Sequence, residues 1–142
     1  MTIQVILQGR EGPIFSCTAD QTVADAVAIL AEKRIGALPV LDGDQVVGIF
    51  SERDVLHCIQ NVGPAFMEKR VAEVMTADVI SVELQKSAIG ALSLMTKRRI
   101  RHLPVVENDR LVGFISIGDL VKYRIDKIEG EAAAMRDYIQ SA

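Results

Sequence analysis

The feature that most constrains the fold is an internal repeat. The second half of the chain repeats the sequence pattern of the first half 65 positions later, without a gap. The matching segments run from residue 14 to residue 54 and from residue 79 to residue 119. Identical pairs include Arg34/Arg99, Ile35/Ile100, Leu38/Leu103, Pro39/Pro104, Val40/Val105, Asp44/Asp109, Val47/Val112, Gly48/Gly113, Ser51/Ser116 and Asp54/Asp119. Any fold for this chain therefore contains two similar units.

Each copy predicts the same order of elements, β-α-β-β-α. A short β-branched strand comes first, over residues 15–18 and 79–82. A helix follows, capped by Thr22 or by Ser87, with Asp25 completing a variant of the capping box in the first copy. Two strands around a tight turn come next, and a second helix begins just after Ser51 or Ser116.

The repeat predicts the organisation of the domain. We expect repeat 1 over 10–60, a linker over 61–76, repeat 2 over 77–125 and an amphipathic helix over 126–142. Because about 50 residues bury too little apolar surface alone, the two repeats should pack together as a pseudo-two-fold α/β pair.

Composition excludes several classes of protein. The N-terminus lacks the pattern of a signal peptide, and no apolar run is long enough to span a bilayer, so we expect a cytoplasmic protein with no membrane partner. Cys17 and Cys58 form no metal-binding or disulfide pattern and are interpreted as buried side chains. A net charge of −3 and an aromatic content of 4% argue against a nucleic-acid partner, despite the basic segment 97–102.

The start of the last helix in each copy is a candidate binding site. Ser51 and Asp54 lie there in the first copy, and Ser116 and Asp119 in the second. Free backbone N–H groups and the helix dipole favour anions and polar ligands, and a carboxylate accepts hydrogen bonds from ribose hydroxyls. The same residues are equally typical of a plain helix cap, so both interpretations stay open.

The sequence Leu-Pro-Val, a turn, and then Gly-hydrophobic-x-Ser-x-x-Asp occurs twice and resembles the CBS-domain pair, also called the Bateman module. The matching segments are 48–54 and 113–119, and the resemblance extends over roughly residues 10 to 125. It implies binding of an adenine nucleotide (AMP, ATP, ADP or NAD) in clefts between the repeats, with no metal required. It also implies assembly into flat dimers.

The resemblance also selects residues. Positions just before Pro104 would supply phosphate contacts, which points to Arg101 and His102, and arginine suits bidentate binding of phosphate. Together with Arg53, these two residues would concentrate positive charge near Ser51 and Asp54. The complete candidate set is Ser51, Arg53, Asp54, Ile80, Arg101, His102, Pro104, Ser116 and Asp119.

The two clefts should differ. The first copy has Gly36 and Ala37 where the second has Arg101 and His102, and Gly118 replaces Arg53 in the second copy. We therefore expect one good nucleotide site and one weaker or empty site.

The C-terminal segment carries a heptad-like apolar stripe, formed by Ile125, Ile128, Ala132, Met135 and Ile139. Either the module's own surface or a second subunit must cover it, and we favour the subunit, hence a homodimer.

These features predict a regulatory module rather than an enzyme, since no catalytic motif can be assembled. It would bind an adenine nucleotide and signal energy or redox state to an unidentified partner protein. The alternative is an interaction or scaffold module whose clefts stay empty.

Overall fold

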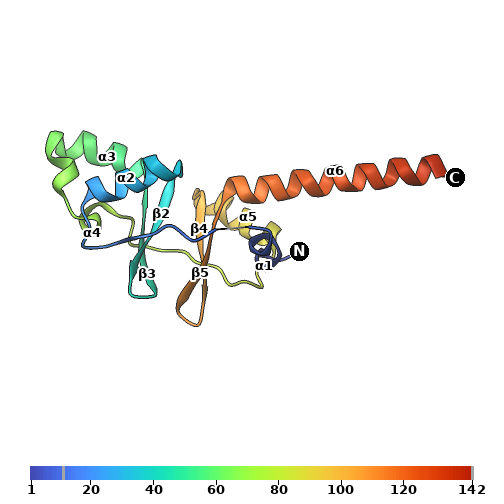
Figure 1. The fold of residues 1–142 in the computed structure, drawn as a ribbon, viewed down its shortest axis with the longest axis horizontal. Coiled ribbons are helices and arrows are strands. Elements are labelled where there is room, and N and C mark those ends of the chain that lie inside the picture. Colours follow the sequence, from blue (N-terminus) through green and yellow to red (C-terminus); the bar gives the residue numbers. More distant parts are fainter. Residues whose placement is uncertain (11, 142) are drawn as a thin grey trace.

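The computed structural model describes residues 1–10 and 12–141. Two α/β repeats lie next to each other along the long axis of the molecule, and the last helix continues beyond the second (Figure 1). The elements in order are α1 (Ile3–Gln8), β1 (Cys17–Thr18), α2 (Val23–Lys33), β2 (Ala37–Asp42), β3 (Gln45–Ser51), α3 (Glu52–Val62), the 3-10 helix η1 (Pro64–Glu68), α4 (Val71–Val74), α5 (Ala88–Arg98), β4 (His102–Glu107), β5 (Arg110–Ser116) and α6 (Ile117–Ser141).

Repeat 1 contains a three-stranded sheet in the order β1-β2-β3, with β1 parallel to β2 and β2 antiparallel to β3. The capping box predicted for α2 is present, because the Thr22 hydroxyl accepts from the Asp25 N–H and the Asp25 carboxylate accepts from the Thr22 N–H. The expected order of elements is confirmed. The first strand is shorter than expected, covering Cys17–Thr18 rather than residues 15–18.

Repeat 2 contains the hairpin β4-β5. The strand expected at 79–82 is wrong in extent, since only Val82 pairs, in a parallel bridge with Val105. Its N–H donates to the Pro104 carbonyl at 3.0 Å, and its carbonyl accepts from the Val106 N–H at 2.9 Å. Ile80 borders a cleft between the repeats instead of extending the sheet.

The N-terminal helix α1 belongs to the core of repeat 2, although it precedes repeat 1 in the chain. Ile3 is fully buried in that core. Its N–H donates to the Lys86 carbonyl at 2.9 Å, and the Ala88 N–H donates to the Met1 carbonyl at 3.0 Å. The sequence pattern did not predict a helix in this segment.

Helix α4 does the converse, because it precedes repeat 2 but packs in the core of repeat 1 through Val71. Helix α1 and the segment after α4 pack against equivalent glycines in the two repeats. A Cβ on Gly48 would lie 2.5 Å from Met75 Sδ, and one on Gly113 would lie 2.5 Å from Leu7 Cδ1. Each repeat is thus completed by the segment that leads into the other one.

Helix α6 is continuous from Ile117 to Ser141, so the helix closing repeat 2 and the expected C-terminal helix form one element. Residue 142 of that expected helix lies outside the described residues. Within the described part of the chain, no helix has the length and apolar character needed to cross a membrane.

Candidate ligand-binding clefts

Two clefts lie between the repeats. The first, about 250 Å³ in volume, brings Ser51 and Asp54 of repeat 1 together with residues 99–102 of repeat 2. The second, about 530 Å³, brings Ser116 and Asp119 together with residues 34–37. The clefts are therefore related by the same pseudo-symmetry as the repeats.

The start of α3 fixes the carboxylate of the first cleft. Asp54 Oδ2 accepts hydrogen bonds from the Ser51 N–H at 2.8 Å and from the Ser51 hydroxyl at 3.0 Å, in a capping box. The capping interpretation of this pair is therefore confirmed. It also holds Asp54 at the wall of the cleft, where the other oxygen, Oδ1, accepts from the Thr76 hydroxyl at 3.3 Å.

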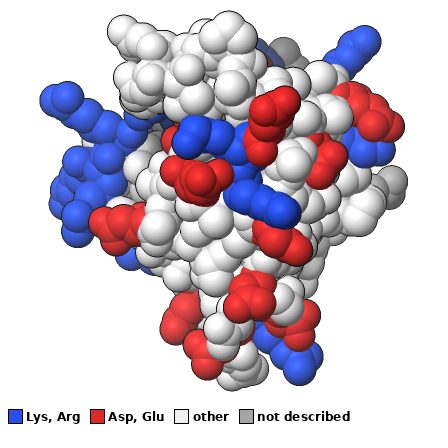
Figure 2. Space-filling model, turned by 90° about the vertical axis from the view of Figure 1, so that its left-hand side faces the viewer, with Lys and Arg blue, Asp and Glu red and all other residues white. Residues whose placement is uncertain are grey.

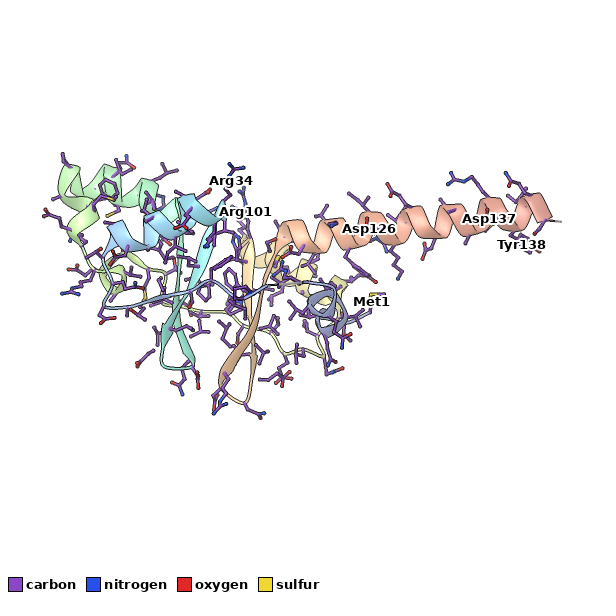
Figure 3. The ribbon with its side chains drawn as sticks, viewed as in Figure 1. Met1, Arg34, Arg101, Asp126, Asp137 and Tyr138 are labelled. Atoms are coloured by element: carbon purple, nitrogen blue, oxygen red, sulfur yellow. The ribbon has the colours of Figure 1, made fainter. Side chains whose placement is uncertain are left out.

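The structure brings the other candidate residues of the first cleft together. Arg53, Ile80, Arg101 and His102 all border this cleft. Figure 3 shows Arg101 of repeat 2 and Arg34 of repeat 1 at the junction between the repeats. Arginine side chains from both repeats therefore face the space between them.

The sequence did not point to four polar residues of the first cleft: Glu52, Thr76, Asp78 and Arg99. Thr76 is placed by the tertiary fold, because its carbonyl accepts from the Ile49 N–H at 2.9 Å in an isolated bridge. Arg99 could have been found, since it is a repeated residue and its left-handed backbone (φ 54°) matches that of Arg34 (φ 55°). The cleft thus has carboxylates as well as guanidinium groups on its walls.

Pro104 does not belong to either cleft. It is buried within β4, where it pairs with Phe114, and it lines neither cavity. The structure therefore places Pro104 away from the walls of both clefts, and its role as a ligand residue stays a prediction.

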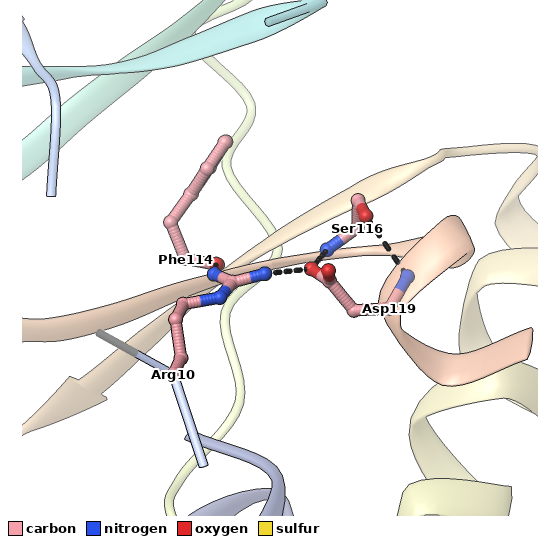
Figure 4. A network of polar contacts seen from close by, with 4 residues as sticks. All are labelled: Arg10, Phe114, Ser116 and Asp119. Atoms are coloured by element: carbon pink, nitrogen blue, oxygen red, sulfur yellow. Dashed lines mark hydrogen bonds and ion pairs between the residues drawn. The ribbon is translucent and has the colours of Figure 1, made fainter. Parts of the chain in front are cut away.

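The second cleft contains a contact that the sequence did not predict. Arg10 forms an ion pair with Asp119 and also donates to the Phe114 carbonyl (Figure 4). Burial opposes ionisation of Asp119, but hydrogen bonds from Arg10 and from the Ser116 N–H outweigh it and hold the pKa of Asp119 below its usual value. The Arg10 guanidinium is therefore already paired with the Asp119 carboxylate, the group to which a ligand in this cleft would bind.

His102 borders both clefts. Its ring stacks on Phe114, with centroids 5.5 Å apart and an interplanar angle of 11°. Burial lowers the pKa of His102 below 6.5, although the carboxylates of Asp119 and Glu52 act in the opposite direction. The neutral form of His102 is thus favoured, which reduces the positive charge that it can add to the cleft.

Both cysteines are buried and free, as expected. Burial raises the pKa of Cys17 to about 11, so this thiol is not a nucleophile at neutral pH. Among residues 1–10 and 12–141, no group of three or more acidic, histidine or cysteine side chains could hold a metal ion.

The two repeats match a known protein family over most of the chain. The CBS domain model matches residues 10–61 and 71–126. The chain belongs to the CBS-domain family. Its two repeats are the two CBS domains of a pair, and CBS pairs are regulatory modules in general.

Curated relatives include CBS domain-containing protein CBSX3, mitochondrial, of Arabidopsis thaliana, which is 36% identical over 138 residues. That alignment covers 94% of this chain and 67% of the plant protein. The inosine-5'-monophosphate dehydrogenase of Mycobacterium tuberculosis is 40% identical over 110 residues, covering 75% of this chain but only 20% of the enzyme. The match to the dehydrogenase is confined to its CBS part.

Solved structures share the fold. A CBS-domain protein from Burkholderia ambifaria is 42% identical with a TM-score of 0.83, and the match covers 89% of this chain and 95% of that one. The CBS-domain pair of protein MJ0100, in complex with 5-methylthioadenosine and S-adenosyl-L-methionine, is 25% identical with a TM-score of 0.75. That match covers 87% of this chain and 98% of the other.

Proposed function

We propose that this CBS pair is a non-catalytic regulatory module that binds an adenine nucleotide in the first cleft. The observation that carries the proposal is the pairing of two kinds of group across that cleft. Asp54, held by the cap of α3, offers an acceptor for ribose hydroxyls, and Arg99 and Arg101 of the other repeat offer guanidinium groups to phosphate.

The ligand class follows from chemistry and from relatives. Protein MJ0100 binds two adenosine derivatives, which supports an adenosine ligand here. Of AMP, ADP, ATP and NAD, we favour AMP, which carries a single phosphate. The volume of about 250 Å³ lies just below the usual range for small-molecule sites, about 300–1,000 Å³, which favours the smallest of these ligands.

A ligand in the first cleft would contact both repeats at once. Because its two ends would be held by different repeats, its presence would stabilise one relative position of the two. We propose that a cytoplasmic partner protein senses this position and so responds to energy or redox state. We also propose that the chain acts as a homodimer.

A scaffold module with empty clefts remains the second candidate. The charges on the face at the repeat 1 end support a protein partner over a nucleic acid, because acidic and basic side chains are interspersed there apart from one basic group at the edge (Figure 2).

The test is calorimetric titration of the full chain with AMP. We expect Asp54→Ala to weaken binding by about 1.5–3 kcal/mol, the scale of a hydrogen bond to a charged group. Asp25→Ala is the matched control, because Asp25 completes the same capping box on α2 but borders neither cleft. Equal affinity of Asp54→Ala and Asp25→Ala would remove Asp54 from the site, and no binding of any of the four nucleotides would favour the scaffold.

A further inference from the structure

Helix α6 carries an uncovered apolar stripe along a part of the helix that projects from the body (Figure 1). Its large side chains are between 43% and 66% exposed. They follow one another at alternating spacings of four and three residues, which are the a and d positions of a heptad repeat. The stripe consists of Val121, Ile125, Ile128, Ala132, Met135 and Ile139.

The body of the molecule does not cover this stripe. At the base of α6, Leu120 is buried in the core of repeat 2 and Tyr123 packs against that core. With 3.6 residues per turn, the centre of the stripe lies roughly a third of a turn around the helix from that side. The distal part of α6 extends away from every other element (Figure 1). The occupant of the stripe must therefore come from another molecule.

The charges that flank the stripe favour a second copy of the same helix. With Ile125 at position a, Arg124 and Glu131 occupy g positions, and Glu129 and Arg136 occupy e positions. In a parallel, in-register pair, each g residue meets the e residue of the partner's next heptad. Arg124 then faces Glu129 of the second copy, and Glu131 faces Arg136, so both kinds of contact join opposite charges.

The antiparallel arrangement with the longest overlap is less favourable. Placing Ile128 against Ala132 of a second copy keeps the apolar layers along the stripe. It also sets Glu129 against Glu129 and Glu131 against Glu131 of that copy, which are contacts between like charges.

We propose that α6 forms a parallel, in-register coiled coil with the α6 of a second copy of this chain. The two-fold axis then runs along the paired helices. Since α6 extends along the long axis of the molecule (Figure 1), the two modules point in the same direction, with one repeat 2 beside the other. This interface is independent of the proposed nucleotide site.

Light scattering coupled to size-exclusion chromatography tests the apolar part of the interface, on full chains at matched concentration. The unaltered chain should elute as a dimer, and Ile128→Asp should shift it to monomer. Ala134→Asp is the matched control, because it adds the same charge to an exposed position off the stripe and should stay dimeric. A monomeric unaltered chain, or a dimeric Ile128→Asp that circular dichroism shows to be folded, would overturn the proposal.

Charge reversal tests the register. Arg124→Glu should raise the dimer dissociation constant by roughly 3- to 30-fold at low salt, because it creates two contacts between like charges. Adding Glu129→Arg to the same chain should restore most of the affinity. Failure of the second change to rescue the first would contradict the g-to-e pairing.

Cross-linking tests the direction of pairing. In a parallel pair, residue 139 meets residue 139, whereas the antiparallel register with the longest overlap sets residue 139 against residue 121. With oxidised glutathione as oxidant, Ile139→Cys should form a covalent dimer, and Asp137→Cys, on the outer face, should form far less. Equal cross-linking of the two variants, or none by Ile139→Cys in a dimeric sample, would rule out the parallel arrangement.

Discussion

At the scale of residues, Asp54 and Asp119 occupy equivalent positions in very different surroundings. Asp54 accepts from Ser51 and Thr76 and has no ion pair in the described structure. Asp119 is paired with Arg10, whose guanidinium also reaches the Phe114 carbonyl. The sequence predicted unequal clefts from the missing arginine at Gly36, and the ion pair supplies a second reason for the inequality.

Removing the Arg10 guanidinium should free Asp119 for a ligand. We expect Arg10→Ala to raise the number of AMP molecules bound per chain from one towards two, with the new site weaker because Gly36 and Ala37 provide no phosphate contact. Calorimetry gives this stoichiometry, and Arg98→Ala, outside both clefts, controls for the lost positive charge. A value of one in Arg10→Ala would show that Arg10 does not close the second cleft.

Arg101 should discriminate between phosphorylated and unphosphorylated ligands. Arg101→Ala is expected to weaken AMP binding by about 1.5–3 kcal/mol, the range for a charge-assisted hydrogen bond, while adenosine binding stays nearly unchanged. Competition titrations with the two ligands would measure the difference. Equal losses for both would place Arg101 away from the phosphate.

The lowered pKa of His102 makes the free energy of unfolding decrease as the solution is acidified. Because burial lowers its pKa in the folded chain below 6.5, the unfolded chain takes up the proton first as the solution is acidified. Its contribution to the free energy of unfolding is therefore complete above pH 6.5 and is lost as pH falls from there through the folded-state pKa. Urea denaturation between pH 8 and pH 5.5 should show this loss in the unaltered chain and a flatter profile in His102→Gln; parallel profiles would contradict it.

At the scale of elements, local signals were enough for helices and hairpins. The cap at Thr22, the turn after Leu41 and the cap at Ser51 each act within a few residues, so the sequence predicted α2, the β2-β3 hairpin and α3. Helix α1 was not predicted because a helix of six residues depends on tertiary packing, and its contacts with repeat 2 lie 80 or more positions away. The strand at 79–82 was overestimated because β-branched residues predict a strand but not its partner.

Two residues of α1 differ in burial and should therefore differ in how much they stabilise the fold. Ile3→Ala should lower the free energy of unfolding by about 2–5 kcal/mol, because Ile3 is fully buried in the core of repeat 2. Val5→Ala on the same helix should change it by less than about 1 kcal/mol, because Val5 is 45% exposed. Chemical denaturation measures both, and similar losses would show that α1 does not depend on the repeat 2 core.

At the scale of the whole molecule, ligand binding and pairing occupy separate regions. The first cleft is built from β3, α3 and the segments flanking α5, whereas the stripe begins at Val121 and ends near the C-terminus. The repeat predicted both clefts and the sequence pattern predicted the stripe. The Arg10 contact could not be predicted, because it joins residues 109 positions apart, 10 and 119.

Truncation after Arg124 should separate the two properties. The shortened chain should be monomeric, since it lacks most of the stripe, and should still bind AMP in the first cleft with affinity within about two-fold of the full chain, because no residue of that cleft is removed. Light scattering and calorimetry on the same sample measure both. Loss of AMP binding in a folded, truncated chain would show that the cleft depends on pairing.

The position of α1 also has a consequence for synthesis on the ribosome. Helix α1 is synthesised before repeat 1, but its binding surface is complete only when β5 has been made, more than a hundred residues later. At translation rates of roughly 5–20 residues per second, Ile3 and Leu7 wait on the order of 5–20 s without their partners. The core of repeat 1 contains no residue beyond Met75, so it can form about half-way through synthesis, whereas the core of repeat 2 needs both α1 and the segment up to Leu120. Repeat 1 is thus expected to fold first, and repeat 2 only when nearly all of its own residues have been made.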